Sequence, residues 1–133
     1  MDISLEAALA AAAAGVEAAK ARSISIGIVI LDQRFVVLVA VRMDRAFPST
    51  VPVATGKAHT ALNFGVSSSA IAAKVVAENK VALTLAEPRL LFVGGGEPVI
   101  CDGVVVGAVG VSGASEEMDC EISAIVARML SNL

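Results

Sequence analysis

Hydrophobic and polar positions recur with two different periods along the chain, and these periods predict helices and strands. From Ser4 to Arg22 apolar residues return every three or four positions, which predicts an amphipathic helix with Ser4 as its N-cap. We expect the buried face of this helix to comprise Leu5, Leu9, Ala12, Val16 and Ala19. From Ile24 to Ile30 every second residue is isoleucine, and this alternation predicts a strand with one apolar face.

Phe35–Met43 is predicted to return antiparallel to that strand, because the intervening Asp32-Gln33-Arg34 is too short for a parallel crossover. A loop containing Pro48 follows, and Leu90–Val93 is predicted to be a further strand. Helices are predicted at Val53–Asn63, at Ser67–Glu78 with Ile71, Val75 and Val76 inward, and after the N-cap Ser115. The segment Lys80–Arg89, which follows the second of these helices, is compatible with loop, strand or helix.

The glycine-rich stretch Phe92–Gly113 is predicted to form a hairpin. Asp102-Gly103 joins two apolar runs, and both residues accept the positive φ that a tight two-residue turn needs. Gly107 and Gly110 leave gaps in the second strand, which indicates that a helix, another subunit or a flat ligand lies close to it. The glycine spacing matches neither the dinucleotide fingerprint nor a phosphate-binding loop.

Taken together, these elements predict a single α+β domain over residues 1–133, with an antiparallel sheet of about five strands flanked by helices. Hydrophobic residues make up 56% of the chain but charged residues only 17%, so the surface is expected to be unusually apolar. Burial of that surface in a homo-oligomer is the simplest explanation.

Charge and cysteine content narrow the possible partners and compartment. A net charge of −3 argues against a nucleic-acid-binding protein, which needs a basic surface. No apolar run reaches 18 residues, so we expect no membrane-spanning helix and no membrane partner. Cys101 and Cys120 are too few and too far apart to indicate a disulfide framework or a metal cluster, and a cytoplasmic location is expected.

Four polar residues are candidates for ligand binding: His59, Lys57, Arg42 and Asp44. His59 is the one histidine of the chain and could serve as a haem ligand, as a general base or as an ordinary surface residue. Arg42, Asp44 and Arg45 lie where a predicted strand ends in a loop, either as a local ion pair or as ligand contacts. With Lys57, Arg42 could form a small pocket for an anion.

Several motifs resemble the GlcG/HbpS haem-binding-protein-like family, which also includes the C-terminal domain of PduO-type cobalamin adenosyltransferases. The resemblance covers nearly the whole chain. It rests on Arg42-Met43-Asp44, Gly56-Lys57-Ala58-His59-Thr60-Ala61, Gly95-Gly96-x-Pro98-Val99, the block Asp102–Gly113, and finally Asp119 and Glu121. It implies a profilin-like α+β fold that assembles into dimers or octamers. The usual Asp-x-Gly-Gly turn of the family is here Asp32-Gln33-Arg34-Phe35, without glycine.

The resemblance implies an oligomeric small-molecule-binding protein whose ligand is haem or a related tetrapyrrole. In this hypothesis His59 binds the haem iron, while Lys57 and Arg42 pair with the propionates. The alternative is an enzyme of a catabolic operon that acts on a small organic acid. There Arg42 and Lys57 would hold the carboxylate, and His59 or Asp44 would move a proton. A third possibility is an accessory subunit without a ligand.

Overall fold

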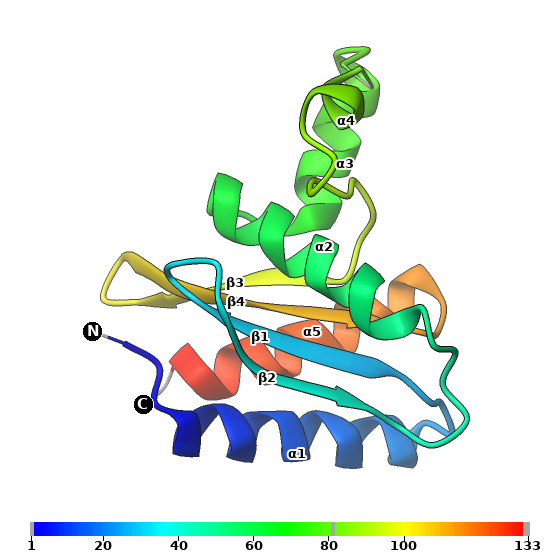
Figure 1. Ribbon diagram of the computed structural model, residues 1–133, viewed down its shortest axis with the longest axis vertical. Helices are drawn as coiled ribbons and strands as arrows, with labels where there is room; N and C mark the ends of the chain where they lie inside the picture. Colours follow the sequence, from blue (N-terminus) through cyan, green and yellow to red (C-terminus); the bar gives the residue numbers. More distant parts are fainter. Residues whose placement is uncertain (1, 81, 132–133) are drawn as a thin grey trace.

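A four-stranded antiparallel sheet forms the centre of the computed structural model, which describes residues 2–80 and 82–131 (Figure 1). The sheet has the order β2-β1-β4-β3. Its strands are β1 (Gly27–Asp32), β2 (Val37–Arg42), β3 (Gly96–Cys101) and β4 (Val104–Ser112). Both predicted hairpins, β1–β2 and β3–β4, are antiparallel, and β1 pairs with β4 to join them. The α+β class predicted from the sequence is therefore confirmed.

Helices cover both faces of the sheet. On one face lie α1 (Leu5–Ala21) and α5 (Glu116–Ser131), while α2 (Thr50–Phe64) crosses the other face (Figure 1). Beyond α2, α3 (Ser68–Ala77) and the one-turn helix α4 (Leu83–Ala86) project away from the sheet. Over the described residues no single helix is long and apolar enough to cross a membrane; α2 and α3 reach that threshold only as a pair, bent by 77°.

The prediction of about five strands is wrong by one, because the described segment Leu90–Val93 does not join the sheet. Two of its backbone groups are bonded to side chains of the helices instead. The N–H of Leu91 donates to Thr60 Oγ1 on α2 at 2.7 Å, and Ser68 Oγ on α3 donates to the carbonyl of Val93 at 2.7 Å. Side-chain hydroxyls thus hold this segment against the helical layer, beside the site described below.

The three predicted serine caps are confirmed. Ser4 Oγ accepts a hydrogen bond from the N–H three residues later at 3.1 Å, and Ser67 and Ser115 accept the equivalent bond at 3.2 Å. Each cap satisfies one of the amide groups that a helix start leaves unpaired. Local chemistry therefore sets where α1, α3 and α5 begin.

The buried face of α1 agrees with the prediction only in part, because Ala12 and Ala19 are buried as expected but the leucines are not. Leu5 and Leu9 are more than half exposed, while the buried positions of α1 are small: Ala8, Ala11, Ala12, Gly15 and Ala19. A Cβ added at Gly15 would lie 2.7 Å from side-chain atoms of both β1 and α5. Close approach of three elements thus selects the smallest residues and leaves the leucines outside. On α3, Val76 is likewise exposed, contrary to prediction.

A glycine in β4 allows α2 to lie directly on the sheet, so of the three neighbours that the sequence left open, a helix, another subunit or a flat ligand, a helix lies against Gly110. A Cβ at Gly110 would lie 1.8 Å from the carbonyl oxygen of Ala54 on α2, so no other residue fits there without moving the helix. The hairpin turn before β4 is also as expected, since Asp102 and Gly103 have φ of 51° and 76°. This close packing sets the height and direction of α2, the helix that carries His59.

Candidate functional site

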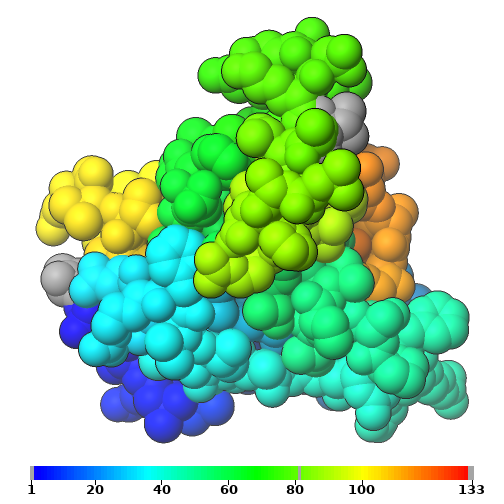
Figure 2. Space-filling view, turned by 45° about the horizontal axis from the view of Figure 1, so that its top comes forward, coloured from blue at the N-terminus to red at the C-terminus, as the bar shows by residue number. Residues whose placement is uncertain are grey.

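A pocket of about 470 Å³ opens between three segments that are distant in sequence. They are the β1–β2 turn, the first three turns of α2, and the segment after α4, and they adjoin on the face shown in Figure 2. The pocket is lined by Phe35, Pro52, Val53, Thr55, Gly56, His59, Pro88, Arg89 and Leu91. A volume of this size, with mostly apolar walls and a few polar groups, is typical of a small-molecule site.

His59 supplies the pocket with an imidazole. Burial, together with the positive charge of Arg89, lowers the pKa of His59 below its usual value of 6.5, and Glu87 offsets this only in part. The imidazole is therefore neutral at pH 7, so one ring nitrogen has a free lone pair. Nδ1 is buried and has no hydrogen-bond partner, and the ring of Phe35 lies 4.6 Å from the imidazole, centroid to centroid. A neutral imidazole that lines a pocket can bind a metal or accept a proton.

Arg89 places a positive charge on the rim of the pocket. Its side chain is 72% exposed and pairs with the carboxylate of Glu87. The segment that carries Arg89 is fixed to α2, because the N–H of Leu91 donates to the Thr60 hydroxyl. Gly56 permits this contact, since a Cβ there would lie 3.2 Å from Leu91 Cβ. The pocket thus combines apolar walls, a neutral imidazole and a guanidinium that an anionic group can reach.

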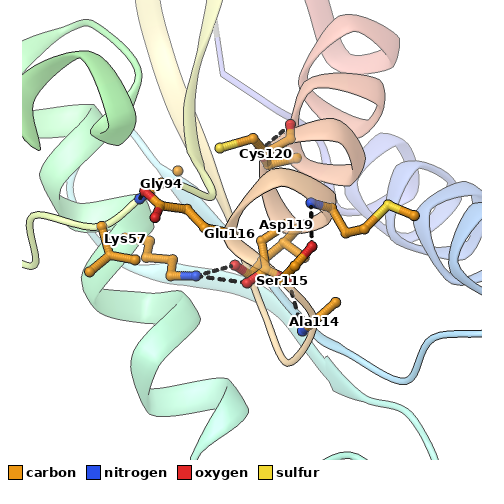
Figure 3. A network of polar contacts seen from close by, with 12 residues as sticks. Lys57, Gly94, Ala114, Ser115, Glu116, Asp119 and Cys120 are labelled. Carbon is orange, nitrogen blue, oxygen red and sulfur yellow. Dashed lines mark hydrogen bonds and ion pairs between the residues drawn. The ribbon is translucent and has the colours of Figure 1, made fainter. Parts of the chain in front are cut away.

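Lys57 lies away from this pocket, in the interior between α2 and α5 (Figure 3). Its Nζ donates to Asp119 Oδ2 at 3.0 Å and to the Val111 carbonyl at 2.9 Å. Both side chains of the pair are less than 5% exposed. Burial raises the pKa of Asp119, and the hydrogen bond and charge of Lys57 offset this only in part. The pair connects α2 to α5 and to the end of β4.

The triple-glycine segment Gly94–Gly96, which leads into β3, packs against this pair. A Cβ at Gly95 would lie 2.9 Å from Lys57 Nζ, and one at Gly96 would lie 2.1 Å from the Lys57 carbonyl oxygen. The N–H of Gly94 donates to Glu116 Oε1 at 2.8 Å (Figure 3). Gly95 and Gly96 therefore pack closely against the lysine of the buried ion pair.

Arg42 and Asp44 lie at a third place, in a hollow of about 300 Å³ beside α1. The guanidinium of Arg42 donates to the carbonyl of Ala46 at 2.8 Å, within its own loop. The structure therefore does not bring the predicted site residues together. Of the four, His59 lines the 470 Å³ pocket, while Lys57 is in the interior and Arg42 and Asp44 line the separate hollow.

Two residues of the pocket were not singled out from the sequence. The sequence did contain a clue to Phe35, because this bulky residue ends the turn Asp32-Gln33-Arg34-Phe35, where glycine would be expected. It contained no such clue to Arg89, since its position depends on how the segment after α4 returns to α2. Within the described part of the chain, no three His, Cys, Asp or Glu side chains gather as they would around a bare metal ion.

Comparisons with known proteins place this fold and sequence in context. A family described as "Haem degrading protein HbpS-like" matches residues 3–127. GlcG of Escherichia coli is 34% identical over 110 residues, which are 83% of this chain and 81% of that protein. The crystal structure of a Streptomyces reticuli HbpS double mutant has a TM-score of 0.90 at 32% identity, covering 98% of this chain and 88% of that one. The crystal structure of a PduOC–haem complex shares the fold, with a TM-score of 0.89 at 24% identity over 97% of this chain and 95% of that one.

Proposed function

Because the chain belongs to the HbpS-like family, we propose that it binds haem or a related planar tetrapyrrole in the pocket beside His59. The observation that carries this proposal is the environment of the single histidine. Its imidazole is kept neutral, its Nδ1 lacks a partner, and it lines a mostly apolar pocket of about 470 Å³. A neutral imidazole is the most common protein ligand of haem iron.

The other residues of the pocket fit such a ligand. The apolar side chains of Phe35, Val53 and Leu91 can cover the macrocycle, and the guanidinium of Arg89 can pair with a propionate. Lys57 and Arg42 were expected in that last role, but Lys57 lies in the interior and Arg42 lines a separate hollow, so we assign it to Arg89. Haem would supply an iron centre when bound. The protein holds it, shields one side from water and keeps the ligating nitrogen unprotonated.

A haemin titration followed by absorbance tests this proposal. The wild-type protein is expected to give a saturable Soret shift, and His59→Ala is expected to lose the shift and bind at least about tenfold more weakly. Asn63→Ala is the matched control, because Asn63 is exposed on the same helix one turn later and does not line the pocket. Arg89→Ala should weaken binding several-fold, by an amount that shrinks as salt is added.

Two outcomes would contradict the proposal in different ways. An unchanged Soret spectrum for His59→Ala would refute the ligand assignment while leaving haem binding intact. A flat titration of well-folded wild-type protein would refute haem binding itself. The organic-acid enzyme would then be the hypothesis to test, with Arg42 and Asp44 in their separate hollow as its candidate contacts.

We also propose that the chain assembles with copies of itself, as a dimer or octamer. Support comes from large apolar side chains on the surface, of which Phe47, Val76 and Leu85 are each more than 70% exposed. Val76 and Leu85 lie on the projecting α3–α4 segment, where no other part of the described chain covers them. Light scattering on wild type and on Leu85→Glu tests this, since a monomeric wild type would contradict it.

The cytoplasmic location expected from the sequence remains a prediction.

A further inference from the structure

Phe35 has a backbone conformation that aromatic residues rarely adopt. Its φ is +66°, in the left-handed region where glycine is favoured and a bulky side chain is strained. Asp32 imposes this conformation on the β1–β2 turn. Its carboxylate accepts the N–H groups of Arg34 at 2.7 Å and Val36 at 3.2 Å, and its own carbonyl accepts the N–H of Phe35 at 3.1 Å. The turn is therefore held in place with or without the aromatic ring.

The core does not explain why a phenylalanine occupies this position. Phe35 belongs to neither of the two clusters of buried apolar residues, and its side chain remains 39% exposed. A glycine would adopt the same φ without strain and would expose no apolar surface. Strained backbone that packing does not require is characteristic of functional sites.

What the conformation achieves is the placement of an aromatic ring in the pocket. The Phe35 ring lies 4.6 Å from the His59 imidazole, at an interplanar angle of 46°, and both rings line the same cavity. His59 makes no hydrogen bond through Nδ1. On the side that faces the β1–β2 turn, the contact with the Phe35 ring therefore restricts the orientation of the imidazole. The position of the ring follows from the turn and not from the core.

We propose that Phe35 is a specificity-determining residue of this pocket, which selects ligands with a flat aromatic face and orients His59 toward them. This inference rests on the proposed function, because it concerns the same cavity. Aromatic rings interact best with other flat π systems in offset or edge-to-face arrangements, and less well with twisted molecules of equal size and charge. The preferred ligand class is thus a planar conjugated ring system with an anionic group within reach of Arg89.

Two variants and three ligands separate the effect of the ring from the effects of strain and of iron. Phe35→Leu keeps an apolar side chain with the same strained backbone but removes the π face. Phe35→Gly also relieves the strain. The ligands are haemin, metal-free protoporphyrin IX and bilirubin, a folded tetrapyrrole that also carries two carboxylates. We expect Phe35→Leu to bind both porphyrins about tenfold more weakly and bilirubin unchanged. His59→Ala should weaken haemin alone.

The ligand-free protein provides an independent readout. Phe35→Gly should unfold at the same temperature as wild type or a higher one, because it removes strain and takes nothing from the core. A lower unfolding temperature would show that Phe35 serves stability, and would overturn the inference. Equal porphyrin affinity in Phe35→Leu and wild type would overturn it while leaving the proposed function intact. Wild-type protein that binds neither porphyrin would overturn both.

Discussion

Removing Asp119 should destabilise the protein strongly, because it leaves the ammonium of Lys57 buried without a counter-ion. In Asp119→Ala the Nζ of Lys57 keeps only the Val111 carbonyl as a partner, and the N–H of Ala114 loses the acceptor it has at 3.1 Å. Breaking a buried ion pair by deleting one partner typically costs about 3–5 kcal/mol. We expect a loss in the free energy of unfolding within that range.

The expected change is large enough to measure by thermal unfolding. At about 2.1 cal/mol/K per residue, a chain of 133 residues has an unfolding entropy of about 0.28 kcal/mol/K. A loss of about 3 kcal/mol therefore lowers the unfolding temperature by about 11 °C. The matched control is Glu17→Ala, which breaks the exposed pair with Lys20 and should cost less than about 1 kcal/mol.

A double substitution tests the physical reasoning behind this prediction. Burial raises the pKa of Asp119 despite the nearby ammonium. The attraction to Lys57 therefore does not fully offset the free-energy cost of removing the carboxylate from water. Lys57→Met with Asp119→Leu should therefore be more stable than Asp119→Ala, although the N–H of Ala114 still lacks its acceptor. If Asp119→Ala unfolds within about 2 °C of Glu17→Ala, the pair does not hold α2 to α5 and the reasoning is refuted.

Three further predictions concern the pocket and the packing of α2. Burial and then the charge of Arg89 lower the pKa of His59, so an NMR titration of this histidine should have a midpoint below pH 6.5. Arg89→Ala should raise that midpoint, and an unchanged midpoint would contradict the assignment. Gly110→Ala should lower the free energy of unfolding by about 2 kcal/mol or more, because the added methyl group overpacks against α2. Gly103→Asn, at a turn position with open space, should lower it by under about 1 kcal/mol, and urea unfolding of both variants measures the difference. Backbone and guanidinium hydrogen bonds lower the pKa of Asp32 although burial alone would raise it. The stability from this lowered pKa should be present above pH 3.8 and lost as pH falls through the folded-state pKa, and Asp32→Asn should remove that dependence.

The elements that were predicted correctly are those whose signal lies within a few neighbouring residues. Ser4, Ser67 and Ser115 cap helices through contacts to amides three positions later. Asp102-Gly103 forms its turn from its own φ preferences. The missing fifth strand shows the limit, because Leu90–Val93 is apolar enough for a strand but finds its hydrogen-bond partners on α2 and α3.

The candidate site was predicted only in part, for the same reason. His59 was identified by residue type alone, as the one imidazole of the chain. The grouping with Lys57 and Arg42 relied on closeness in sequence, but Lys57 and His59 project from different sides of α2, and Arg42 lies beside α1. Phe35 and Arg89 are far from His59 in sequence and meet it only because the β1–β2 turn and the segment after α4 converge on α2.

By itself, the sequence determined the α+β class, the two antiparallel hairpins, the starts of α1, α3 and α5, and the family, since each depends on local periodicity, turn chemistry or matched motifs. Only the tertiary structure decided which face of α1 is buried, which cation reaches the pocket, and that Lys57 is an interior ion pair. These outcomes depend on how closely elements approach across space. At Gly15 and Gly110 the neighbouring element can pack closely only because glycine has no Cβ atom. The sequence shows the glycine, but only the structure shows which element packs against it.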